Sequence, residues 1–530
     1  MKKFVAVLLS LSCVISLAAC GGGGSAAPAG GSGGGGGGGA AAASSKLDEI
    51  KFTDGKWNLA EAAAPWKGET LHFIGEALPP LQALSDLAPK FTEITGVNVQ
   101  VEMYGQEEVN QKTTADFVGG TAIYDMVLGP HRQMGTYVEN DWLLPLNDFL
   151  ENEKLRDPDF DLQGDGVLDQ RWWKECCWYN GQLYAFPFDF IAMYTWYRYD
   201  YFENPIEQEN FKAKYGYDLP SPPVTVEEVH DVAEFFTRKK GELLCGEPLQ
   251  DDLYGITLMG KRHVSTWYNI LNALYVFGAR EIEADEGHEY GTIAINSDKA
   301  VKALEWYKDM TQFCPPGVLQ TDWDSSQANM QQGIAVMGWE WDDATGAVEN
   351  PDESVAAGKI AYTGLPIAEG GTKAVGIEGW NYLIPKGSKH PELAWLFLQW
   401  AMNNEVQKEQ MFEGGESGVT AIYDDPDIQA IPYVPTAVYL KTGGKKIISV
   451  REPGADNGIG VSQRYIDAIN PATGDTSVTT FSKPRFPEQQ EIVDAILLST
   501  SKILSGEMEI KPALDECAAK FKEILGDKAK

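Results

Sequence analysis

The chain has few cysteines, few histidines and a shortage of basic residues. Its 530 residues include 7 Cys and 6 His, and 43 Lys and Arg stand against 77 Asp and Glu, for a net charge of −34. Because nucleic-acid affinity comes from Lys and Arg on phosphates, this balance argues against a nucleic-acid partner. It argues equally against an anionic ligand attracted by the overall field, and it suits a neutral or cationic ligand.

The cysteines do not form a disulfide framework. Cys13 and Cys20 belong to the start of the chain, which leaves an odd number in the body: Cys176, Cys177, Cys245, Cys314 and Cys517. The sequence contains no CxxC pair and no His at metal-ligand spacing. The adjacent Cys176 and Cys177 could form a strained vicinal disulfide, but we expect them to be small buried hydrophobes on an aromatic-rich helix.

Long apolar runs are also missing, with one exception at the start. Two lysines precede the apolar run 4–17, which is too short to span a bilayer comfortably as a permanent helix. This pattern is typical of a secretory signal, which we predict over residues 1–19. Its last residues with Cys20, LAAC, resemble the lipobox of bacterial lipoproteins. That resemblance implies a diacylglyceryl group on Cys20, and an ordinary signal followed by a chance Cys is the alternative.

Residues 20–46 comprise Cys20, the expected lipidation site, and a segment dominated by Gly, Ala and Ser. A segment of this composition is a flexible tether, and about 26 such residues have a root-mean-square span of about 28 Å. Two acyl chains make a stable anchor. We therefore expect the protein on the outer face of the cytoplasmic membrane, at the cell surface or in a periplasm, in contact with the membrane through lipid only.

The body beyond the tether, about 480 residues, is too long for one core and predicts two lobes. Its first part alternates strands with helices: strand 70–75, helix 81–94 closed by Gly96, strand 97–101, helix 107–117 and strand 123–128. This order implies a parallel sheet with ligands beyond the carboxyl ends of its strands.

Further elements follow from apolar periodicity and capping residues. Strands are predicted at 181–189, 193–198, 333–338 and 380–385. Helices are predicted after the Thr225 and Glu228 capping box and at 297–310, 391–402, 488–504 and 512–525.

Five segments, in order, resemble the bacterial extracellular solute-binding proteins of family 1, the sugar receptors of ABC importers. They are FTEITGVNV (91–99), YDMVLG (124–129), GQLYAFP (181–187), GIAVM (333–337) and GWNYLIPKGS (379–388). The resemblance extends over about 66–525, but residues 414–485 contain no match.

The resemblance implies an α/β fold of the periplasmic-binding-protein-like type II, with two lobes, a hinge and a central ligand cleft. Lobe 1 would comprise 66–190 plus 381–425, and lobe 2 would comprise 191–380 plus 430–530. The expected ligand is a neutral saccharide, an oligosaccharide if the extra length enlarges the cleft. The expected partners are the transmembrane subunits of an ABC permease. We expect a monomer without a cofactor and without catalysis.

Aromatic side chains suit the C–H faces of a sugar, and carboxylates or amides suit its hydroxyl rim. We expect Trp380 and one of Trp339 and Trp341 to stack on the ligand. Trp196 and Trp267 are weaker aromatic candidates, since both lie in segments apolar enough for a core. The polar candidates for the site are Asp189, Glu76, His131, Arg132 and Glu340. For each, core packing, a helix cap or a solvated loop charge is the alternative.

Other motifs fail. Residues 255–262 nearly match the motif of a phosphate-binding loop, but Arg262 occupies the position where Ser or Thr is needed to hold Mg²⁺. The acidic loop 157–169 hints at Ca²⁺, yet Trp172 takes the place of the EF-hand Glu. Three rivals stay open: the same fold binding a polyamine or other small cation, a secreted glycosidase or lyase, and a surface adhesin that has lost transport.

Overall fold

The computed structural model describes residues 46–160, 173, 176–284, 290–341, 344–348, 353–371, 374–412, 417, 419, 422, 479–481 and 485–530. The predicted signal 1–19, Cys20 and the tether up to residue 45 lie outside the described residues. So do 161–172 of the acidic loop and most of 414–485.

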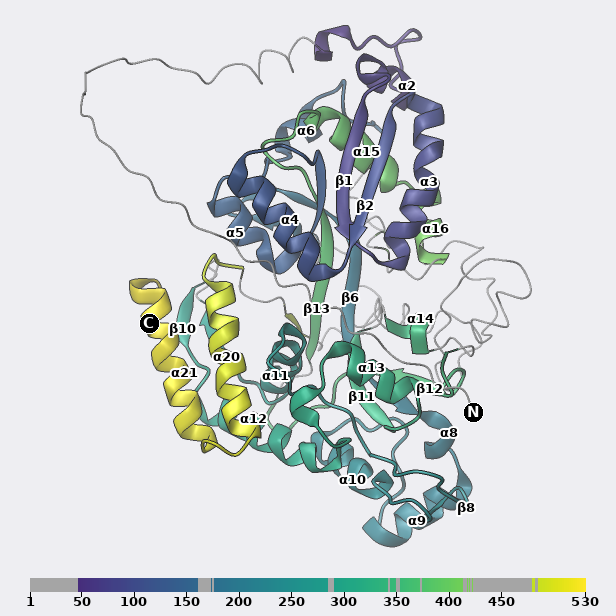
Figure 1. Ribbon diagram of the computed structural model, residues 1–530, viewed down its shortest axis with the longest axis vertical. Coiled ribbons are helices and arrows are strands. Elements are labelled where there is room, and N and C mark those ends of the chain that lie inside the picture. Colours follow the sequence, from purple (N-terminus) through teal and green to yellow (C-terminus); the bar gives the residue numbers. More distant parts are fainter. Residues whose placement is uncertain are drawn as a thin grey trace, which may run out of the picture.

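Figure 1 shows two groups of elements joined by two long strands, β6 (Ala185–Arg198) and β13 (Ala374–Leu383). The upper group, here the first lobe, begins with α2 (Leu59–Ala63), η1 (Ala64–Trp66), β1 (Thr70–Glu76), α3 (Pro79–Thr95), β2 (Asn98–Tyr104), α4 (Gln106–Gly119) and β3 (Met126–Pro130). It continues with η2 (His131–Gln133), α5 (Met134–Glu139), α6 (Asn147–Glu151), β4 (Trp178–Tyr179), β5 (Gln182–Leu183), α15 (Pro391–Ala401) and α16 (Asn404–Phe412).

The lower group, here the second lobe, contains most of the remaining elements. They begin with α8 (Tyr199–Phe202), α9 (Pro205–Tyr215), α10 (Val226–Phe236), β7 (Leu243–Leu244), β8 (Glu247–Pro248), α11 (Val264–Val276), β9 (Ile282–Ala284), β10 (Gly291–Ile293) and α12 (Asp298–Met310). They end with η3 (Thr311–Phe313), η4 (Val318–Gln320), α13 (Trp323–Gln331), β11 (Met337–Trp341), α14 (Thr345–Val348), β12 (Ile360–Thr363), α20 (Gln489–Leu504), α21 (Ile510–Leu525) and η7 (Gly526–Lys528).

One sheet runs through both lobes. Within the described residues it has eight strands in the order β11-β6-β13-β3-β1-β2, with β12 paired to β6 and β14 (Thr479–Phe481) paired to β13. β1 pairs in parallel with β2 and with β3, as the alternation of strands and helices predicts. Their carboxyl ends, Glu76 and Pro130, therefore lie at the same edge of the sheet.

β6 corrects the prediction of two separate strands at 181–189 and 193–198. It is a single strand of 14 residues, 185–198. Residues 185–192 pair with β13, whereas 193–198 pair with β11 and β12. The strand is long because each half has its own partner for the backbone hydrogen bonds. β6 thereby passes without interruption from one lobe to the other.

Three other predicted strands are displaced. β3 starts at Met126 rather than 123, β11 occupies Met337–Trp341 rather than 333–338, and β13 starts at Ala374 and ends at Leu383. The WEW motif at 339–341, expected beyond a strand end, therefore lies inside β11. Apolar periodicity marks a strand, but the position of the pairing partner decides where it starts and stops, here 197–193 opposite 337–341.

Several local predictions are confirmed. Gly96 ends α3 with a positive φ of 73°, a conformation that costs glycine little because it lacks a Cβ. Thr225 and Glu228 form both hydrogen bonds of a capping box at α10. Cys176 and Cys177 are buried and form no disulfide with each other. In the part of the chain that is described, no helix combines the length and apolarity needed to cross a bilayer.

The described residues form two large hydrophobic cores. The first includes Leu71, Phe73, Phe91, Trp395 and Phe397 of the first lobe. The second includes Trp267, Leu271, Tyr307, Trp339 and Phe521 of the second lobe. β6 contributes side chains to both, so the cleft between the lobes is bridged by a strand that is anchored at each end.

Candidate functional site

A cleft of about 580 Å³ lies where the two lobes face each other. The first lobe supplies Glu76 at the end of β1, the start of α4 and Arg132 of η2. The second lobe supplies the start of α11, the start of α13 and Trp341 at the end of β11. Ile191 of β6 and Glu378 and Trp380 of β13 lie between them. The volume of the cleft is in the range of small-molecule sites.

Aromatic rings dominate the second-lobe wall of this cleft. The rings of Trp323 and Trp341 are stacked, with centroids 6.0 Å apart and 21° between the planes. Tyr268 meets Trp341 edge to face at 5.1 Å. Trp380 lines the cleft from β13. Flat apolar rings beside hydrogen-bonding groups match the faces and rim of a sugar or sugar alcohol.

A chain of buried polar side chains lies beside the aromatic wall. Arg132 Nη1 donates to the Tyr268 hydroxyl at 2.9 Å, and this hydroxyl donates to Glu378 Oε2 at 2.8 Å. His131 Nδ1 is 2.7 Å from the other Glu378 oxygen. Burial raises the pKa of Tyr268, although the Arg132 charge opposes this, so the hydroxyl keeps its proton. This protonation allows it to accept from Arg132 and donate to Glu378 at once.

The cleft also carries more carboxylates than cations. The acidic residues of its lining are Glu76, Glu107, Glu108, Asp322, Asp324 and Glu378. Several are already engaged: Glu378 with Tyr268 and His131, Asp322 with Lys261, and Glu108 with Lys112 at 3.6 Å. These pairings reduce the negative charge that a bound molecule would meet.

Two titratable side chains shape the second-lobe rim. Burial raises the pKa of Asp322, but hydrogen bonds from Lys261 and Ser325 outweigh it and bring the pKa to about 2. Burial lowers the pKa of His263 below its ordinary 6.5, and the nearby Asp322 charge only partly opposes this. Neutral His263 caps α11, because its Nδ1 accepts from the Ser265 backbone N–H at 3.3 Å.

The structure brings together part of the predicted site. Glu76, Arg132, Trp341 and Trp380 line the cleft. His131 is fully buried behind it and touches the lining residue Glu378.

The other predicted residues lie away from the lining. Trp339 is buried and stacks on Trp306 of α12 at 5.4 Å. Trp196 is buried edge to face with Tyr362 at 5.1 Å, and Trp267 packs beside Tyr268 within the second core. Asp189 and Glu340 are also buried, on β6 and β11.

Several lining residues were not predicted as part of the site. They are Trp323, Tyr268, Glu378, His263 and Asp322. Asp322 and His263 are helix N-caps, which a capping search detects as structure and not as a binding site. Glu378 directly precedes the GW pair at 379–380, and its inward position follows only from the pairing of β13.

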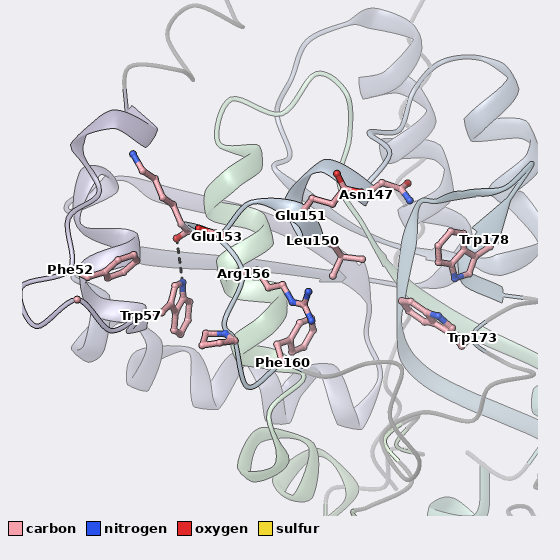
Figure 2. A pocket seen from close by; sticks show the side chains of 13 residues that line it. Phe52, Trp57, Asn147, Leu150, Glu151, Glu153, Arg156, Phe160, Trp173 and Trp178 are labelled. Carbon is pink, nitrogen blue, oxygen red and sulfur yellow. Dashed lines mark hydrogen bonds between the residues drawn. The ribbon is translucent and has the colours of Figure 1, made fainter.

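A second and larger hollow, of about 1070 Å³, lies on the first lobe (Figure 2). Figure 2 shows Phe52 and Trp57 at one end, Phe160 between the ends, and Trp173 and Trp178 at the other end. None of the predicted site residues is among its lining residues. The interlobe cleft is therefore the better candidate, because it joins both lobes and four of those residues.

A two-lobed α/β fold with a ligand-sized cleft between the lobes defines a solute-binding protein. Residues 77–408 match the family described as "Bacterial extracellular solute-binding protein". This match covers more than half of the chain, so the protein belongs to that family of binding proteins.

Individual relatives are more distant. The erythritol/L-threitol-binding protein of Mycolicibacterium smegmatis is 24% identical over 373 residues, which is 69% of this chain and 71% of the relative. A solute-binding protein of Agrobacterium radiobacter K84 in complex with ribitol is 25% identical, with a TM-score of 0.62 over 87% of this chain and 99% of that one. Maltose-bound MalE3 of T. maritima has a TM-score of 0.62 at 19% identity, over 86% of this chain and 100% of its own, and so supports the fold.

Proposed function

We propose that this protein is the substrate-binding component of an ABC importer and captures a neutral polyhydroxylated ligand, a saccharide or a sugar alcohol. The observation that carries the proposal is the cleft itself, where stacked Trp323 and Trp341 stand beside hydrogen-bonding Arg132. The names of the erythritol/L-threitol and ribitol relatives support the same ligand class.

The protein would work by closing and not by catalysis. Ligand contacts with both lobes favour the closed state, which the permease subunits would recognise. We assign lobe 1 to 66–190 plus 381–425 and lobe 2 to 191–380 plus 430–530, with a monomer tethered to the outer face of the cytoplasmic membrane through lipidated Cys20. The name "Probable ABC transporter-binding protein", from a Deinococcus radiodurans relative 26% identical over 260 residues, supports the transport role.

A polyamine or other small cation is the second candidate, because the lining has six carboxylates and one arginine. A cation could bind between such carboxylates and the indole faces. We place it second since Glu378 and Asp322 already have basic or hydroxyl partners.

The test is a thermal-shift screen of the full-length chain in detergent with saccharides, sugar alcohols, polyamines and amino acids. A ligand that binds only the folded state stabilises it by about 2.7 kcal/mol when its concentration is roughly 100 times Kd. We expect one saccharide or polyol class to raise the melting temperature. This shift should be lost in Trp323→Ala, because that indole forms the cleft wall.

Trp57→Ala is the matched control, because Trp57 lines the other hollow (Figure 2). It should bind as the wild type does. Loss of the shift in Trp57→Ala but not in Trp323→Ala would move the binding site to that hollow. A shift with spermidine or putrescine alone would select the cation candidate.

A further inference from the structure

The hydrogen-bonded chain beside the aromatic wall connects the two lobes. Arg132 belongs to η2 of the first lobe, Tyr268 to α11 of the second, and Glu378 to β13, which joins them. The hydrogen-bonded chain ends in the first lobe at His131, also in η2, whose Nδ1 is 2.7 Å from Glu378 Oε1. One hydroxyl group of the second lobe is thus held between a cation and a carboxylate.

All four side chains are shielded from water. Their exposed fractions are 0% for His131, 9% for Arg132, 5% for Tyr268 and 4% for Glu378. Hydrogen bonds to charged groups contribute more than neutral ones, and an ion left without its partner after burial is costly. The position of Tyr268 relative to Arg132 and Glu378 is therefore strongly favoured over positions in which the lobes separate.

Three of these residues, Arg132, Tyr268 and Glu378, also line the cleft. A molecule in the cleft would contact groups whose orientation depends on the Tyr268 hydroxyl. We propose that Tyr268 is a positioning residue that couples ligand binding to lobe closure, by holding Arg132 and Glu378 in place across the lobes. The ligand in this inference is taken from the proposed function, whereas the effect of Tyr268 on the lobes does not depend on that function.

The test is Tyr268→Phe, which removes the hydroxyl and keeps the ring that packs on Trp341. The measurement is hydrogen–deuterium exchange of the full-length chain, without additive and with erythritol, ribitol or maltose. Without additive, we expect roughly tenfold faster exchange at 106–108 and 322–324, which line opposite sides of the cleft. Loss of the hydrogen bonds of the Tyr268 hydroxyl, worth about 1.4 kcal/mol, changes the equilibrium between closed and open lobes by a factor of ten. A probe that binds should show a Kd raised roughly ten- to hundredfold.

Tyr275→Phe is the matched control. Tyr275 lies seven residues further along α11, is also buried, and its ring packs against Arg280 at 3.7 Å. It should leave both the exchange and the Kd unchanged. Glu378→Gln is a second variant in case Tyr268→Phe folds poorly, and it should speed exchange in the same two segments.

The outcomes separate the two ideas. Unchanged exchange in Tyr268→Phe and Glu378→Gln without additive would overturn the coupling role, even if the Kd rises, because Tyr268 would then be only a contact residue. If no probe binds the wild type but the exchange accelerates as expected, the role of Tyr268 in holding the lobes together stands and the proposed ligand class fails.

Discussion

Trp339 and Trp341 lie two positions apart on one strand but have different roles. Both lie on the same face of β11, and each stacks on another indole, Trp306 for Trp339 and Trp323 for Trp341. Trp306 of α12 covers Trp339, whereas Trp323 and Trp341 line the cleft. The sequence shows that this motif is aromatic and acidic. It does not show which indole is covered, because the covering helix comes from a distant segment.

Replacing each indole by Phe should separate binding from stability. Trp341→Phe should raise the Kd of a bound saccharide or polyol roughly tenfold, since it loses part of a stacking surface worth about 1–1.5 kcal/mol. Trp339→Phe should instead lower the free energy of unfolding by about 2 kcal/mol, because it leaves a gap beside Trp306. Calorimetric titration and denaturant unfolding of both variants check this. Equal Kd values in the two variants would contradict the assignment of Trp341 to the cleft.

The elements themselves were predicted better than their ends. Helices with a clear cap, such as α10 and α12, start where Thr225 and Ser297 indicate. The strands β6 and β11 differ from prediction because backbone pairing with strands distant in the sequence, not the local pattern, sets their limits. The predicted site residue Arg132 does line the cleft, yet Glu378, the partner of the adjacent His131, is 247 residues away and could not be inferred from spacing.

The capping box of α10 provides a test at this scale. The Thr225 hydroxyl accepts from the Glu228 backbone N–H at 3.1 Å, and the Glu228 side chain accepts from the Thr225 N–H. Thr225→Ala should reduce the free energy of unfolding by about 1 kcal/mol, since a backbone donor loses its partner. Val224→Ala is the control, because the neighbouring Val224 is exposed and should change little. Urea unfolding of both proteins gives the comparison, and equal loss in the two would argue against the cap.

At the scale of the whole molecule, a histidine in each lobe, His390 in the first and His263 in the second, has a shifted pKa that links stability to pH. In the first lobe, the hydrogen bond with Asp125, at 3.4 Å, raises the pKa of His390, although partial burial opposes it. Burial raises the pKa of Asp125, but the bond from His390 and others outweigh it and hold the pKa below 3.8. In the second lobe, burial lowers the pKa of His263 below 6.5.

The two histidines act on opposite sides of pH 6.5. The folded protein binds a proton more tightly at His390 than the unfolded chain does, so this stabilisation is complete below 6.5 and is lost as pH rises through the raised pKa. At His263 the unfolded chain binds the proton more tightly, so stability falls as pH drops from 6.5 through the lowered pKa. Glu69, 3.7 Å from His390 Nε2, adds to the first effect.

Melting temperatures measured from pH 5 to 9 should therefore show separate changes in two variants. His390→Gln should remove part of the loss of stability above pH 6.5 and leave the acidic side unchanged. His263→Gln should remove part of the loss below pH 6.5 and leave the alkaline side unchanged, because the two residues belong to different lobes and do not share a partner. If both variants changed the same side of the profile, the opposite linkage of the two lobes would be wrong.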